Sequence, residues 1–152
     1  MGWLSASAIW AEAGEFHGKV SRVIDGDTVE IRHDGRTERI RLRGIDCPEL
    51  RQPYGKQAKR AVRAMVSGRT VSVKTYGKST RGPVLADMII ERGRSVAYIL
   101  LEEGLAWRTT SGSSDEALEA AEVEARYAKR GLWSDPNPVA PWVYRASKSR
   151  TR

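Results

Sequence analysis

Two carboxylates, Asp46 and Glu49, stand three positions apart at the end of the stretch Ile40–Glu49, with Arg41 just upstream. The stretch begins with apolar and charged residues in alternation, which predicts a strand. Pro48 then removes a donor from the ladder, so the pairing ends there. Acids at the end of a rigid strand are held in place and can still be reached by solvent. This location suits a metal ligand or a general base.

An earlier stretch is predicted to pair with this strand. Residues 28–32 alternate in the same way, and the Asp-Gly pair at 34–35 is a strong signal for a two-residue hairpin before the return strand at 40–43. With that turn, Thr28 lies opposite Arg41.

This hairpin brings distant charges to one end. Asp27, Arg41 and Asp46 are predicted to converge there. In an ideal register Asp27 and Arg41 point to opposite faces of the sheet, so we expect a β-bulge near Gly26 or Gly44. The alternative is an ordinary hairpin with solvated charges.

These motifs resemble a known signature. Residues 25–28 (Asp-Gly-Asp-Thr) and 41–49 (Arg-Leu-Arg-Gly-Ile-Asp-Cys-Pro-Glu) closely resemble that of the staphylococcal nuclease (thermonuclease) family. Residues 130–133, followed by Pro-Trp at 141–142, are similar to the closing pattern of its bacterial members. The resemblance covers roughly residues 16–145.

The order of elements, with strands first and helices between, indicates an α+β domain. We expect strands at 16–24, 28–32, 40–43, 69–75 and 84–90, and helices at 54–67, 95–103 and 113–130. The resemblance implies an OB-type five-stranded β-barrel packed with three helices, which suits nucleic-acid binding. The predicted organisation is an N-terminal extension or signal remnant at 1–15, the nuclease-like domain at 16–145, and a basic, disordered tail at 146–152.

The resemblance also implies roles for the charged residues. Asp27 and Asp46 supply hard oxygen ligands for Ca²⁺, and the backbone carbonyl of Cys47 completes the protein's share. Glu49 acts as the general base, directly or by orienting water, and Arg41 grips the phosphate with a bidentate fork. The thiol of Cys47 is expected to be a bystander.

A second phosphate-binding arginine is harder to place. The sequence departs from the family's Tyr-Gly-Arg pattern at this point, because Tyr76-Gly77 is followed by Lys78. Arg81, reached through a short insertion, is the candidate, and Lys78 is the alternative. The family's two nucleotide-stacking tyrosines are also absent, since residues 107–110 read Trp-Arg-Thr-Thr; contacts to base or sugar are therefore expected to differ.

By resemblance, the chain is a Ca²⁺-dependent endonuclease that cuts DNA and RNA to 3′-phosphate ends with little sequence preference. The alternative of the same fold is a catalytically weak or inactive module that binds nucleic acid or protein. A third hypothesis, a plain OB-type single-strand binder, requires strand aromatics that are scarce here.

Length, composition and charge limit the class of protein and the kinds of partner. The chain has 152 residues, 40% of them hydrophobic, and a formal net charge of +7, which favours polyanionic partners. Cys47 is the only cysteine, so no intramolecular disulfide forms. No apolar run is long enough to span a membrane, and a monomer is expected. The apolar segment 1–13 favours a secreted or periplasmic location, with a cytoplasmic one as the alternative.

Overall fold

The computed structural model describes residues 14–78, 82–110 and 115–150. The strands are β1 (Glu15–Val23), β2 (Thr28–His33), β3 (Arg36–Leu42), β4 (Ile45–Asp46), β5 (Thr70–Lys78), β6 (Val84–Ile90), β7 (Arg94–Ser95) and β8 (Trp107–Arg108). The helices are α1 (Gly55–Val66), α2 (Val96–Glu102), α3 (Glu116–Tyr127) and α4 (Pro141–Ser149), with 3-10 turns η1 (Glu91–Gly93) and η2 (Gly131–Ser134).

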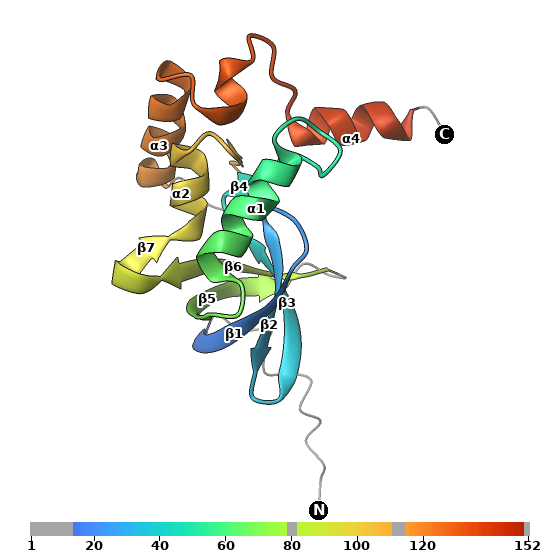
Figure 1. Ribbon diagram of the computed structural model, residues 1–152. Coiled ribbons are helices and arrows are strands. Elements are labelled where there is room, and N and C mark those ends of the chain that lie inside the picture. The colour runs from blue at the N-terminus through green and yellow to red at the C-terminus, as the bar shows by residue number, and fades with distance from the viewer. Residues whose placement is uncertain (1–13, 79–81, 111–114, 151–152) are drawn as a thin grey trace, which may run out of the picture.

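The main sheet closes on itself. Its strand order is β3-β2-β1-β5-β6-β7, and a parallel pairing of β3 with β6 joins the two sides. The result is a five-stranded barrel with β7 added at one edge, and the helices pack around it (Figure 1). The prediction of an α+β, OB-type barrel is confirmed. Strands β4 and β8 form a separate two-stranded ladder.

The hairpin register is the predicted one. Thr28 pairs with Arg41, and the turn residues Asp34 and Gly35 have φ of 48° and 72°, as a type I′ turn requires. The bulge expected near Gly26 or Gly44 is not found, because β2 and β3 pair without a register shift. The irregularity lies instead between β1 and β2.

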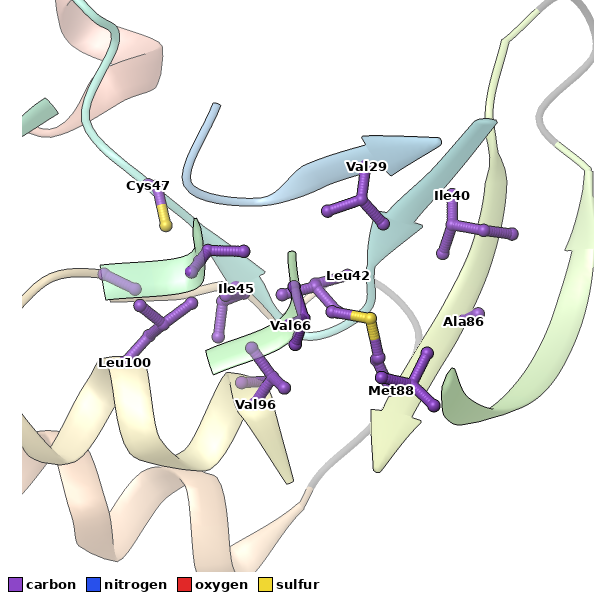
Figure 2. Packing of buried hydrophobic residues seen from close by; sticks show 14 of the residues in the cluster. Val29, Ile40, Leu42, Ile45, Cys47, Val66, Ala86, Met88, Val96 and Leu100 are labelled. Carbon is purple, nitrogen blue, oxygen red and sulfur yellow. The ribbon is translucent and has the colours of Figure 1, made fainter. Parts of the chain in front are cut away.

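The core lies between the barrel wall and α1 and α2. The buried face of α1 consists of Ala58, Val62 and Val66, at the helical spacing that the sequence predicts. These side chains join Leu42 and Leu100 in one apolar cluster (Figure 2). The cluster packs α1 against the strands, and Ala58 of α1 lies next to the loop that carries Asp27.

A second, smaller cluster contains Ala125, Leu132 and Trp133, with Tyr54 and Trp107 packed against it. Leu132 and Trp133 pack against the C-terminal part of α3, and the ring of Trp133 lies edge-on to that of Trp107.

Two helices differ from the sequence-based expectation. Helix α3 begins after Asp115, whose carboxylate accepts from the backbone N–H groups of Ala117 and Leu118. The predicted helix at 113–130 began at Ser113, which lies outside the described residues. The predicted and the observed helix otherwise overlap.

Helix α4 was not predicted. Pro141 occupies its first turn, where a missing N–H costs nothing and a fixed φ favours the helix. The helix continues across the predicted domain end at residue 145, so residues 146–149 are helical rather than part of a disordered tail. Figure 1 shows α4 next to the loop that precedes α1.

Of the predicted extension at 1–15, residues 1–13 lie outside the described residues, whereas Glu15 already belongs to β1. Over the ranges that the structure does describe, no helix has the length and apolarity needed to cross a membrane.

Candidate functional site

The first carboxylate of the site sits in the loop between β1 and β2. The backbone N–H of Asp27 donates to the carboxylate of Asp25 at 3.0 Å, which forms an Asx-type turn. A Cβ on Gly26 would lie 2.8 Å from the Cβ of Ala58 and 2.9 Å from the Sγ of Cys47. Only glycine fits there, so the loop packs closely against α1. Asp27 is buried in this position.

The second carboxylate, Asp46, lies just beyond β3. Gly44 has a φ of +82°, a conformation that glycine adopts without strain, and it turns the chain into β4. Asp46 then pairs with Trp107 of β8. This turn, rather than a bulge, brings Asp46 back towards Arg41, whose Nη2 lies 3.2 Å from Asp46 and 3.7 Å from Asp27. The predicted convergence of Asp27, Arg41 and Asp46 is therefore present in the structure.

Hydrogen bonds to Gln52 hold the backbone of Glu49. Its N–H donates to the side-chain Oε1 of Gln52 at 2.8 Å, and its carbonyl accepts from the N–H of Gln52 at 2.8 Å. Gln52 is itself buried and donates through Nε2 to the carbonyl of Val139 at 3.0 Å. A Cβ on Gly55 would come within 1.9 Å of the Glu49 carbonyl, so the turn can close only with glycine there.

The structure adds a residue that the sequence analysis missed. Arg145 of α4 donates to both carboxylate oxygens of Asp46, at 3.3 Å from Nη1 to Oδ1 and 2.7 Å from Nη2 to Oδ2. Its Nη1 also donates to Glu49 at 2.6 Å. The available signal was Pro141: read as the start of a helix, it places Arg145 about one turn inside.

Burial separates the carboxylates into two kinds. The side chains of Asp27 and Asp46 are each 6% exposed, whereas those of Glu49 and Arg145 are 39% and 45% exposed. Burial, followed by repulsion from Asp25, raises the pKa of Asp27 from 3.8 to about 6, despite the nearby guanidinium of Arg41. Hydrogen bonds to Asp46 and Glu49 raise the pKa of Arg145. Asp27 and Asp46 are therefore the buried carboxylates of the site, and Glu49 lies at its solvent side.

Cys47 takes part through its backbone. Its N–H donates to Asp27 Oδ2 at 2.8 Å and so orients that carboxylate. Figure 2 shows its side chain pointing into the apolar cluster, where burial and nearby carboxylates raise the pKa of the thiol well above its usual value. This agrees with the expectation that the thiol is a bystander. The role of the Cys47 carbonyl as a metal ligand stays a prediction.

The predicted second phosphate arginine, Arg81, lies outside the described residues. Lys78 is the last residue of β5, so that strand runs further than the predicted 69–75. Just before it, Tyr76 donates its hydroxyl to Asp87 at 2.9 Å, and the guanidinium of Arg43 lies 4.0 Å from the centroid of its ring.

The donor set fits a hard divalent cation. Asp27 and Asp46 offer carboxylate oxygens, and the pKa of Asp27 is raised first by burial and then by repulsion from Asp25, both of which a bound cation would offset. Across the described ranges 14–78, 82–110 and 115–150, no group of three or more His, Cys, Asp or Glu side chains is arranged to hold a metal ion. A cation held by these two aspartates completes its shell with carbonyl, water or phosphate oxygens.

A closed OB-type barrel with paired carboxylates and arginines gathered at one end defines a class of protein that works on phosphodiesters. The comparisons with known proteins agree. The family model described as "Staphylococcal nuclease homologue" matches residues 39–135, and the chain belongs to the staphylococcal nuclease family.

The chain is also similar to individual bacterial proteins along most of its length. It is 38% identical over 134 residues to an uncharacterized endonuclease of Escherichia coli, covering 88% of each chain. It is 37% identical to Protein ParB of Escherichia coli, covering 97% of this chain and 87% of that one. It is 36% identical to a micrococcal nuclease of Shigella flexneri, covering 93% and 86%. The predicted enzyme class, a nuclease, is confirmed.

Proposed function

We propose that this nuclease hydrolyses DNA and RNA in a Ca²⁺-dependent reaction with little sequence preference and leaves 3′-phosphate ends. The observation that carries the proposal is the meeting of Asp27, Asp46, Glu49 and Arg41 at one end of the barrel. Phosphate-directed groups carry no base information, which supports weak sequence preference.

Three groups would hold the cation in this proposal. Asp27 and Asp46, with the Cys47 carbonyl, are the proposed ligands. A bound Ca²⁺ supplies Lewis-acid polarisation of the phosphoryl oxygen and lowers the pKa of coordinated water. The hydrogen bond from the Cys47 N–H keeps the Asp27 carboxylate in position.

The remaining groups act on water and phosphate. Glu49, exposed and held by Gln52, accepts a proton from the attacking water or orients it. Arg41 donates to the phosphoryl oxygens, where negative charge increases in the transition state. The bond from phosphorus to the 5′ oxygen breaks, and that oxygen takes a proton from solvent. Arg81, or Lys78 in its place, remains the proposed second phosphate contact.

The test compares cleavage of single-stranded DNA and RNA in Ca²⁺ and in EGTA by the wild type, Glu49→Gln and Glu91→Gln. We expect Ca²⁺-dependent cleavage, a loss of about a hundred- to ten-thousandfold in Glu49→Gln, and no change in Glu91→Gln, since Glu91 is an exposed residue of η1. Mobility shifts after treatment with a 3′-phosphatase identify the product ends.

Two results would contradict the proposal. A folded wild-type protein that binds DNA without cutting it would favour the non-catalytic binding module. Equal cleavage by the wild type and Glu49→Gln would remove Glu49 from the proposed role of base.

A further inference from the structure

Helix α4 brings a second guanidinium into the site from a part of the chain far from the hairpin. Arg145 spans Asp46 and Glu49, one carboxylate that is buried and one that faces solvent. Arg41 contacts only the buried pair, Asp27 and Asp46. The two arginines thus share Asp46, and Arg145 is the one that also contacts the exposed carboxylate of Glu49.

The position of Arg145 is fixed by contacts other than its own. Pro141 is buried at the start of α4, and Trp142 packs edge-to-face on Trp107 with ring centroids 5.6 Å apart. Trp107 is the strand partner of Asp46. The backbone just before the helix accepts a hydrogen bond from the buried side chain of Gln52 at 3.0 Å. The helix is therefore tied to the same two segments that carry Asp46 and Glu49.

The charges of the site explain why a second guanidinium is needed. Four carboxylates, those of Asp25, Asp27, Asp46 and Glu49, gather around Arg41 and Arg145. A divalent cation brings this formal charge to neutrality. Without Arg145 the loaded site would be negative and would repel the phosphodiester that it has to bind. Arg145 allows the site to accept a further negative charge.

The Arg145 guanidinium can also exchange a carboxylate partner for a phosphate. A guanidinium has five N–H donors in a planar fork that matches carboxylate and phosphate oxygens equally well. In this structure it donates to Asp46, which is a proposed cation ligand. A cation at Asp46 competes for the same oxygens, which leaves one edge of the Arg145 guanidinium to donate elsewhere.

We propose that Arg145 binds the substrate phosphate directly, as an arginine that α4 contributes to the nuclease site. This inference rests on the proposed function, because it concerns the same phosphate. It assigns a phosphate-contacting role to the C-terminal helix, independently of the role of the 79–81 segment.

The test measures binding as well as cleavage. A fluorescein-labelled single-stranded oligonucleotide is titrated by anisotropy in Ca²⁺ in the Glu49→Gln background, which slows cleavage. Arg145→Gln is expected to weaken binding about tenfold to a hundredfold, the value of a charge-assisted hydrogen bond, and Arg145→Lys to recover part of it. Arg150→Gln, which removes the same charge from the exposed end of α4, is the matched control and is expected to change binding less than threefold or so.

Calcium binding without nucleic acid, measured by calorimetry, separates the phosphate role from a ligand-positioning one. Arg145→Gln is expected to bind Ca²⁺ as tightly as the wild type or more tightly, since a competitor for Asp46 is gone. Far-ultraviolet circular dichroism and tryptophan fluorescence, which is sensitive to the packing of Trp142 on Trp107, check that α4 stays folded and docked.

Several outcomes would overturn the inference. Unchanged or tighter oligonucleotide binding in Arg145→Gln would make Arg145 a counter-ion that substrate displaces. Lost Ca²⁺ binding would make it a positioning residue for Asp46. A loss of oligonucleotide affinity equal to that in Arg150→Gln would mean that Arg145 contributes only general charge attraction. Absence of cleavage by the wild type would instead contradict the proposed function, so the two failures are distinguishable.

Discussion

At the scale of single residues, Asp27 carries the largest electrostatic cost in the site. Its carboxylate is buried beside Asp25, and its pKa is raised to about 6. Three groups still hold it: the N–H of Cys47, the hydroxyl of Thr28 and, at longer range, Arg41. The structure therefore keeps a carboxylate that is unfavourable without a cation, which is expected of a ligand rather than of a stabilising ion pair.

This cost predicts a stabilising substitution. Between about pH 4 and 6 the folded state holds more protons than the unfolded state, so the free energy of unfolding falls as pH rises through that window. Above it, the full penalty is on the order of 3 kcal/mol. Asp27→Asn can donate to Thr28 and accept from Cys47. With a chelator present, it is expected to be more stable than the wild type at pH 8 by that order, with no gain at pH 4.

Urea unfolding across this pH range is the measurement, with Asp34→Asn as the control because Asp34 is exposed at the hairpin turn. The explanation fails if Asp27→Asn is less stable than the wild type at pH 8. Added Ca²⁺ is expected to stabilise the wild type more at pH 8 than at pH 5, where Asp27 is largely protonated, and to do little for Asp27→Asn.

At the scale of elements, the loop between β4 and α1 is organised by one buried amide. Gln52 accepts from the N–H of Glu49 and donates to the carbonyl of Val139, so a single side chain links the proposed base to the segment that leads into α4. Burying a polar side chain is favourable only when its hydrogen bonds are made. Gln52 is therefore expected to position Glu49 and Arg145 together.

Gln52→Ala is predicted to lower the free energy of unfolding by about 1–3 kcal/mol, because the two partly buried hydrogen bonds of the Gln52 side chain are lost. It is also expected to lower kcat more than it changes KM, since Glu49 loses its orientation. Gln57→Ala, at an exposed position of α1, is the control and should change neither. If Gln52→Ala is destabilised with kcat intact, Gln52 serves stability alone.

The same scale shows what the sequence can and cannot reveal. The hairpin register followed from alternation and one Asp-Gly turn, because strand periodicity and turn geometry are local. The sequence predicts that Asp46 lies near Arg41 but not the turn that brings it there, since the turn at Gly44 depends on the pairing of β4 with β8. Arg145 was missed because its contacts with Asp46 and Glu49 are set by tertiary packing of three tryptophan rings, Trp133, Trp107 and Trp142, and no local pattern encodes these.

At the scale of the whole molecule, the formal net charge of +7 attracts nucleic acid but does not by itself identify the binding surface. Helix α1 carries Lys56, Lys59, Arg60 and Arg63 on the face opposite its buried residues. Such a row is most often a solvated surface. Arg145, in contrast, sits at the carboxylates where the phosphate is proposed to bind.

Salt dependence distinguishes these two kinds of charge. Each phosphate contact on a single strand releases counterions and adds about 0.7 to the slope of log K against log salt concentration. Arg145→Gln is therefore predicted to reduce the slope by about 0.7. The double variant Lys56→Gln/Arg60→Gln removes twice the charge. It is still expected to change the slope less, because long-range attraction to the strand, without direct phosphate contacts, releases few counterions. Anisotropy titrations of one labelled strand at several salt concentrations give all three slopes. A larger reduction in the α1 variant would place the path of the nucleic acid along α1, and the site at the barrel end would then be approached from that helix.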